Sequence, residues 1–173
     1  VYLHDVYSGP GLAGVPRGTV KNLRIAAYNF GYPNLAGPDK IGLGGPWEAM
    51  QIIGTVPVLA DGSATFRVPA NTPITLQPLD REGKAVQLMR SWFTAMPGEK
   101  VSCIGCHEKP NETALPRGSM AARIEPMDIR PWHGPARGFD FQREVQPVLD
   151  AHCAGCHDGT KSTIPDLRSE KLV

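Results

Sequence analysis

Two copies of a five-residue motif, Cys-x-x-Cys-His, constrain this 173-residue chain more than any other feature. The first copy spans residues 103–107 and the second spans residues 153–157. At this spacing, two thiols can add to the vinyl groups of one haem, and the adjacent imidazole then lies under the macrocycle as an iron ligand. The motifs therefore predict two covalently attached haem c groups. The residues expected to bind them are Cys103, Cys106, His107, Cys153, Cys156 and His157, with the two histidines as proximal iron ligands.

The cysteine count favours haem over the other uses of paired cysteines. All four cysteines lie inside the motifs, so none is left for a disulfide framework. A zinc site built from two Cys-x-x-Cys knuckles is an alternative, but its knuckles are usually separated by roughly 12–20 residues. Here 46 residues, 107–152, separate the two pairs, and zinc gives no reason for a histidine after each pair. A thioredoxin-like redox pair would need a βαβ context, which we do not find.

Charge and hydropathy exclude two classes of partner. The chain has 18 Lys and Arg against 17 Asp and Glu, whereas a nucleic-acid-binding domain is strongly basic. No apolar run approaches the roughly 20 residues that span a bilayer. We therefore expect no nucleic-acid partner and no membrane span in this chain. Because c-type haem is attached outside the cytoplasmic membrane, the predicted location is periplasmic or extracellular.

Both ends of the sequence look incomplete for an exported cytochrome. The first residues, Val1–Asp5, form neither the charged nor the apolar region of a signal peptide, so we expect a leader to have preceded them. Only residues 158–173 follow the second motif, and they contain no Met or His. We therefore expect the second haem domain to be truncated at residue 173, with its distal ligand coming from elsewhere.

The first hundred residues predict a small β domain. The chain has 19 Gly and 17 Pro, which favour short elements joined by turns, and residues 1–19 are interpreted as loop. Asp61-Gly62 and Asp80–Gly83 are hairpin turn signals between β-forming runs. We predict that residues 1–100 form an antiparallel, β-sandwich-like domain. The β-forming runs are 20–28, 52–59, 64–68, 74–79 and 85–92.

Residues 101–173 predict a loop-rich, partly helical di-haem cytochrome c segment, which makes the expected fold mixed. Apolar side chains recur with helical spacing from residue 141 to residue 149. Asp140 is a suitable N-cap, and Pro147 should kink or break the helix. This helix would deliver Cys153 at its end.

Four side chains are candidates for the distal iron ligands: His133, His4, His152 and Met96. Each also has an ordinary explanation, because a loop histidine, a mobile terminus or a solvent-facing side chain needs no iron. A methionine ligand would raise the reduction potential of its haem. Met89 could serve too, but its place in a β pattern favours core packing.

Several stretches resemble the middle and C-terminal haem regions of the hydrazine synthase alpha subunit and related planctomycete-type di-haem c-type cytochromes. The resemblance implies a shared architecture with two covalent haems. It is carried by Ile53–Val58, Asp61–Ala64, Val68–Ile74, Leu76–Asp80, Leu88–Trp92, Met96–Glu99, Ser102–Glu108 and Phe141–His157.

The departures from that family bear on the chemistry. The resemblance implies a β-propeller ahead of this region, which the chain lacks. It also implies a catalytic middle-domain haem, whose iron is bound by a tyrosine four residues after the motif histidine while that histidine binds zinc. In this chain the corresponding position is Asn111, a poor iron ligand. We therefore do not carry hydrazine chemistry over, and we expect His107 to ligate iron in the ordinary way.

The leading functional prediction is a periplasmic or extracellular di-haem c-type cytochrome that carries out electron transfer. It would act alone or within a larger redox assembly or conduit, and its partners would be redox proteins such as other cytochromes or copies of itself. The alternative is a haem enzyme subunit with one five-coordinate haem that acts on a small nitrogen or oxygen species. A third hypothesis is an interaction module, in which the β domain docks the haem segment onto a larger assembly.

Overall fold

The computed structural model describes residues 1–29, 49–89, 91–109, 111–113, 118–132, 134, 140–161 and 163–169. The chain separates into two compact units, Val1–Ala136 and Arg137–Val173. This division differs from the predicted boundary after residue 100, because the first unit includes the first Cys-x-x-Cys-His motif. The reason is a strand pairing between the N-terminus and Ser102–Cys103, which binds the motif to the β domain.

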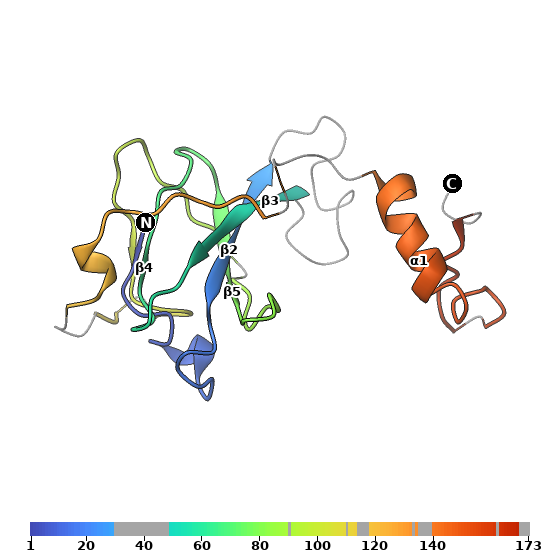
Figure 1. Ribbon diagram of the computed structural model, residues 1–173, viewed down its shortest axis with the longest axis horizontal. Helices are drawn as coiled ribbons and strands as arrows, with labels where there is room; N and C mark the ends of the chain where they lie inside the picture. The colour runs from blue at the N-terminus through green and yellow to red at the C-terminus, as the bar shows by residue number, and fades with distance from the viewer. Residues whose placement is uncertain are drawn as a thin grey trace. The chain divides into compact units, whose positions relative to one another are not determined.

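An antiparallel sheet of three strands forms one part of the first unit. Its central strand is β2 (Asn22–Asn29), which lies between β3 (Ala49–Pro57) and β5 (Ile74–Leu79), as Figure 1 shows. Leu23, Ile25 and Ala27 alternate along β2 and are buried, as expected for a strand with one face on the core. The predicted strands at 20–28, 52–59 and 74–79 are thus confirmed to within a few residues.

A second sheet of three very short strands holds the N-terminus. Its central strand is β1 (Tyr2–Leu3), which pairs antiparallel with β4 (Ala64–Thr65) and parallel with β6 (Ser102–Cys103). The chain then continues into a single helical turn, η1 (Pro10–Leu12). The prediction that residues 1–19 are all loop was therefore wrong at β1, because a two-residue strand is too short to leave an alternating pattern.

The turn at Asp61-Gly62 forms, but the predicted hairpin around it does not. Gly62 N donates to Leu59 O at 2.9 Å, which closes the turn. The flanking strands then diverge, with β3 pairing to β2 and β4 pairing to β1. The Asp61 carboxylate accepts hydrogen bonds from Ser63 N and Met120 N, so it holds the turn against a distant segment.

The second predicted hairpin is confirmed only at its turn. Asp80 N donates to Lys84 O at 2.9 Å, and an isolated antiparallel bridge joins Leu79 to Ala85. The returning segment next pairs with β5 at Phe93, opposite Ile74. Between these bridges the described residues 86–89, 91 and 92 are not in a strand, and several of their side chains line the cavity described below.

One apolar core lies beneath both sheets. It is built from buried side chains of β1, β2, β3, β4 and β5, and the half-buried Cys103 and Cys106 pack against it. The first unit is therefore a β domain of small, mainly antiparallel sheets with little helix. The core side chains are Leu3, Val6, Leu12, Val20, Leu23, Ile25, Ala27, Val56, Ala64, Phe66 and Ile74.

The second unit contains the predicted helix. A π-helical turn, η3 (Phe141–Val145), leads into α1 (Gln146–His152). The Asp140 carboxylate accepts a hydrogen bond from Arg143 N at 2.9 Å, which confirms the predicted N-cap. Pro147 lies in the first turn of α1, where a proline is tolerated, and the irregular turn precedes it. No helix among the described residues has the length and apolarity to cross a membrane.

Candidate cofactor sites

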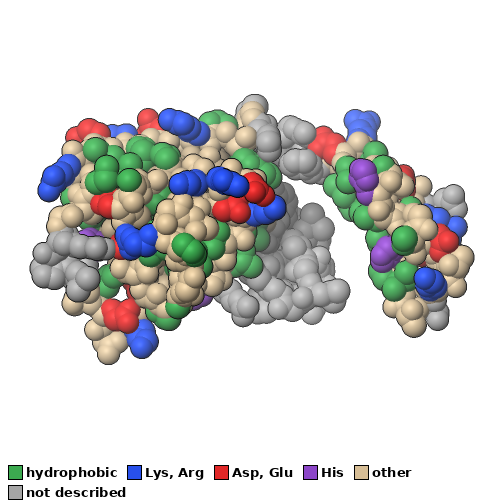
Figure 2. All heavy atoms as spheres, turned by 60° about the horizontal axis from the view of Figure 1, so that its bottom comes forward, with side chains coloured by type: hydrophobic (Ala, Val, Ile, Leu, Met, Phe, Trp, Pro, Cys, Tyr) green, Lys and Arg blue, Asp and Glu red, His purple; other side chains and the backbone are tan. Residues whose placement is uncertain are grey.

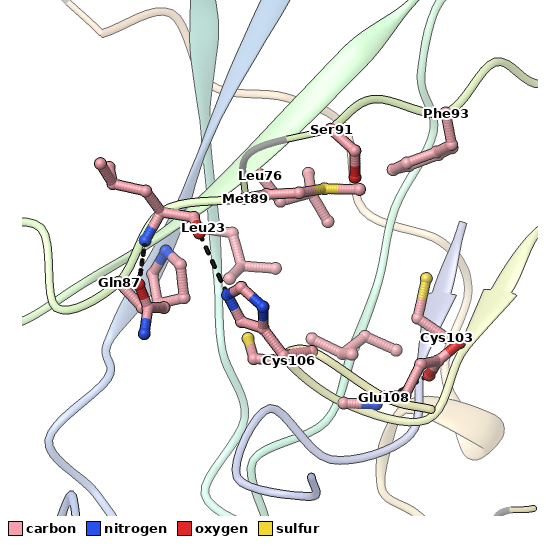
Figure 3. A pocket seen from close by; sticks show the side chains of 14 residues that line it. Leu23, Leu76, Gln87, Met89, Ser91, Phe93, Cys103, Cys106 and Glu108 are labelled. Carbon is pink, nitrogen blue, oxygen red and sulfur yellow. Dashed lines mark hydrogen bonds between the residues drawn. The ribbon is translucent and has the colours of Figure 1, made fainter. Parts of the chain in front are cut away.

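The first Cys-x-x-Cys-His motif forms part of the wall of a cavity of about 360 Å³ in the first unit. This volume falls within the range of roughly 300–1,000 Å³ that is typical of small-molecule sites. The cavity wall is mostly apolar, and its side chains come from β2, β5, the 87–93 segment and the motif (Figure 3). Cys103, Cys106 and His107 all line it, so the structure brings together the three residues that the motif predicted as one site.

The motif loop is held by backbone hydrogen bonds to the N-terminal segment. His4 N donates to Cys103 O at 2.9 Å and Asp5 N donates to Ile104 O at 3.0 Å. Gly11 N donates to Cys106 O at 3.2 Å, and a Cβ at Gly11 would overlap the imidazole of the motif. Asp5 and Gly11 were missed as site residues, and His4 was predicted only as a distal ligand, because backbone contacts between distant segments leave no pattern in the sequence.

The side chain of Glu108 completes this support. Its carboxylate accepts hydrogen bonds from Ile104 N and from Gly105 N, so it caps the two central residues of the motif loop. His107 has a φ of 57°, in the left-handed region that few residues other than glycine adopt. The surrounding contacts therefore fix an uncommon backbone conformation at the predicted iron ligand.

A buried carboxylate anchors the N-terminal segment next to the motif. Asp5 is 2% exposed and accepts two hydrogen bonds from the Arg17 guanidinium, at 3.0 and 3.2 Å. Tyr7 N also donates to this carboxylate, at 3.1 Å. The hydrogen bond that Arg17 donates to Asp5 raises the pKa of Arg17 above its ordinary value. Because Asp5 N donates directly to Ile104 O of the motif, the ion pair positions the motif loop.

Replacing Arg17 with alanine is expected to destabilise the first unit by about 2 kcal/mol, because a buried charge loses its counter-ion. All three tryptophans lie before residue 137, so tryptophan fluorescence during urea unfolding reports on this unit alone. Arg81→Ala is the matched control, since the ion pair of Arg81 with Glu82 is exposed and should contribute less than about 1 kcal/mol. Equal losses in the two variants would contradict the anchoring role.

The imidazole of His107 faces the segment that closes the cavity. Its Nε2 lies 3.2 Å from the carbonyl oxygen of Leu88, and Figure 3 shows this contact as a dashed line. An iron ion bound at this nitrogen would take the place of the hydrogen bond. The ring is therefore held in the cavity by an interaction that a cofactor can replace.

The two thiols of the first motif are buried enough to stay protonated at neutral pH. Burial is the largest cause of the raised pKa of Cys103, and Glu108 adds to it. Burial together with the charges of Cys103 and Glu108 raises the pKa of Cys106 to about 11. Figure 3 shows the two sulfur atoms on separate parts of the wall, and neither forms a disulfide. A dithiol oxidoreductase has a thiol of lowered pKa next to its partner thiol, and the protonated, separated thiols of this motif differ from that arrangement.

The second motif shows a different histidine arrangement. His157 Nδ1 lies 2.9 Å from the carbonyl oxygen of Pro165, and Leu167 N donates to His157 O at 3.0 Å. A metal-binding histidine is commonly oriented in this way through its second ring nitrogen. The contact leaves Nε2 of His157 available to an iron ion, whereas in His107 the same nitrogen is the one engaged.

A partly uncovered apolar face accompanies the second motif. Phe141 is 47% exposed and Val148 is 56% exposed, although both belong to the predicted apolar face of the helix. Figure 2 shows hydrophobic and histidine side chains together on the visible face of this unit. Val145 and Leu149 on the same face are partly buried, so the described residues of the second unit cover this face only in part.

The three predicted distal ligands that the structure describes do not line the first cavity. His4 is buried beside Tyr2, with its Nδ1 3.4 Å from the Tyr2 hydroxyl, but it does not line the cavity. His152 is exposed at the end of α1, and Met96 is 67% exposed. His133 lies outside the described residues. Met89, which we interpreted as core packing, does line the cavity.

The residues at both motifs fit a haem c group. The first site combines two thiols, an imidazole and apolar walls in one cavity, and the second combines a motif with an oriented histidine and a partly exposed apolar face. Among the residues that the structure describes, no group of three or more His, Cys, Asp and Glu side chains is arranged to hold a metal ion directly.

Comparison with known proteins identifies the first unit. The family model of the hydrazine synthase alpha subunit middle domain matches residues 18–108, which is more than half of the chain. The chain belongs to this family. The matched region contains the first motif and ends directly after it, so the three haem-binding candidates and all lining residues of the cavity except Leu3 fall within the matched domain.

A solved structure shares this fold. The chain is similar to a chain of Kuenenia stuttgartiensis hydrazine synthase, with a TM-score of 0.66 and 21% sequence identity. The match covers 94% of this chain but 30% of that one, so the sequence corresponds to less than a third of its relative. At this identity the similarity concerns the fold of the chain. No curated protein matches.

Proposed function

We propose that this chain is a redox module that carries one covalent haem c in each unit and transfers single electrons. The observation that carries the proposal is the convergence of Cys103, Cys106 and His107 on one apolar cavity. Membership of the hydrazine synthase alpha subunit middle-domain family supports a redox role for that cavity.

At both sites the two cysteines and the histidine of the motif would bind haem in the same way. Each thiol adds across a haem vinyl group, with its sulfur bonding to one carbon and its hydrogen going to the other, so no external oxidant is needed. His107 and His157 would each supply an axial nitrogen to iron. A bound haem supplies reversible one-electron chemistry. The apolar walls at Leu23 and Leu76 would limit water access, which tunes the reduction potential.

The proposal includes the cellular location of the chain and its partners. Because c-type haem is attached outside the cytoplasmic membrane, we place the mature chain in the periplasm or outside the cell. The matching family model describes a domain of an alpha subunit, which supports an assembly with redox partner proteins. Other cytochromes or copies of this chain are the partners of matching chemistry.

A haem count tests the proposal. We expect the chain, expressed with a c-type maturation system, to carry two haems by the pyridine-haemochrome assay and by intact mass. Cys103→Ala with Cys106→Ala should leave one haem, and Cys153→Ala with Cys156→Ala should also leave one. A wild-type chain with fewer than two covalent haems would disprove the di-haem proposal.

Catalysis is the second candidate function, and the family of the first unit is the observation that favours it. In that reading one haem is five-coordinate and open to a small nitrogen or oxygen species. Asn111, which is exposed and follows the first motif, offers no strong ligand to compete with such a species. Electron paramagnetic resonance of the oxidised protein separates the two functions, because two low-spin signals support the carrier and a high-spin signal supports the enzyme.

A further inference from the structure

The cavity of the first motif contains one more side chain that is suited to bind iron. Of the described polar lining residues, Gln87 donates from its amide to Gly11 O at 2.8 Å and accepts from Leu88 N at 2.9 Å. Glu108 caps the motif loop through Ile104 and Gly105. Beyond the motif itself, the thioether of Met89 is the remaining soft donor on the wall.

Met89 follows the residue whose carbonyl oxygen contacts the predicted proximal histidine. The carbonyl oxygen of Leu88 lies 3.2 Å from His107 Nε2, so this peptide already occupies the direction in which an iron ion would bind. Met89 is the next residue. Met89 lines the same cavity as His107, so its thioether and the imidazole can both reach a cofactor bound there.

The segment that carries Met89 is attached to the sheet. Thr75 Oγ1 donates to Met89 O at 3.0 Å, and Phe93 exchanges backbone hydrogen bonds with Ile74 at 2.9 and 3.0 Å. Both anchor residues on the sheet belong to β5. With its backbone held, the methionine can still adjust through its three side-chain torsions, which is the property that suits it to irregular sites.

We propose that Met89 is the second axial ligand of the haem on the first motif, giving this iron His–Met coordination. The assignment rests on the proposed function, since it needs a haem at Cys103 and Cys106. When the haem is in place, the Leu88 carbonyl gives up its contact with His107 and the thioether binds from the opposite side. Methionine ligation raises the reduction potential and closes the iron to small molecules.

Spectroscopy of a single-haem variant tests the assignment. In the full-length chain with Cys153→Ala and Cys156→Ala, only the first haem remains. We expect its oxidised form to be low-spin and to show the weak far-red charge-transfer band of His–Met ferric haem. Met89→Leu, which keeps the size of the side chain, should abolish the band, produce a high-spin signal and lower the reduction potential.

The matched control is Met96→Leu in the same background, because Met96 is exposed and lies outside the cavity. This variant should keep the band and the potential. Met89→His should restore a low-spin signal without the band, which shows that a ligand at this position reaches the iron.

The outcomes separate the two proposals. A single covalent haem that lacks the far-red band, or a band that survives Met89→Leu, would overturn the Met89 assignment and leave the haem count intact. A chain without covalent haem at the first motif would overturn the proposed function and this assignment together.

Discussion

Gly105→Ala is expected to prevent haem attachment at the first motif, whereas Gly155→Ala should leave the second motif fully loaded. Both glycines occupy the same position of the Cys-x-x-Cys-His motif. A Cβ at Gly105 would overlap the carbonyl oxygen of Ser8 and lie 2.7 Å from that of Asp5, and backbone atoms cannot move aside. A Cβ at Gly155 would meet nothing within 4 Å. The pyridine-haemochrome assay should therefore give one haem for the first variant and two for the second.

The same clash should weaken the first unit before any haem is bound. We expect Gly105→Ala to lower the free energy of unfolding of the haem-free first unit by about 3 kcal/mol, the upper end of the usual cost of overpacking. Urea unfolding followed by tryptophan fluorescence measures this loss. Gly118→Ala is the control within the unit, because its Cβ would make an ordinary contact of 3.7 Å. A loss of under about 1 kcal/mol for Gly105→Ala would show that the motif loop is not packed against the N-terminal segment.

In the haem-free chain, Cys106 is expected to react with iodoacetamide about 100-fold more slowly at neutral pH than an unperturbed thiol, since each pKa unit is a tenfold change in thiolate. The physical reason is burial next to Cys103 and Glu108, which raises the pKa of Cys106 from 9.0 to about 11. Mass spectrometry of peptides after timed alkylation gives the rate. The rate should rise with pH until the pH reaches the pKa, because only the thiolate is the nucleophile.

The control for this measurement is Cys106 itself in urea, where unfolding removes the burial and should restore the fast reaction. Cys156 is exposed and provides an internal reference in the folded chain. If the folded and unfolded chains were alkylated at Cys106 with equal rates, the thiol would not be buried in the cavity wall.

Local sequence patterns predicted the individual elements of this fold well. The three strands of the larger sheet have their β-forming runs, and the turns at Asp61-Gly62 and Asp80–Gly83 have the residues that such turns require. Asp140 caps the helical segment and Pro147 marks its irregular start. These features depend on neighbouring residues, so they can be recognised from a short window of sequence.

The same local patterns could not predict which distant segments pair with each other. The strands that flank Asp61-Gly62 were expected to pair with each other, but each pairs with a strand from nearer the N-terminus. Strand β1 has two residues, and its partners Thr65 and Ser102 are far away in the sequence. A short strand carries no periodic signal, and its partner depends on which surfaces of the core remain uncovered.

The candidate site was also predicted only in part. The sequence named Cys103, Cys106 and His107, and the structure places all three on one cavity. It also proposed Met96 as a sulfur ligand, which the structure leaves exposed, and interpreted Met89 as core packing, although Met89 lines the cavity. The β pattern around Met89 breaks between the bridges at Ala85 and Phe93, and only the folded chain reveals that break.

The sequence by itself determined that two thiols and an imidazole fall within five residues, and this spacing predicts haem attachment whatever the rest of the chain does. The tertiary structure alone decided what surrounds those residues: which segment holds the first motif, which carbonyl faces His107, and which sulfur lies in the cavity. The carbonyl that faces His107 and the wall of the cavity are made by contacts between distant segments, and their positions follow from the packing of the core and not from any local spacing.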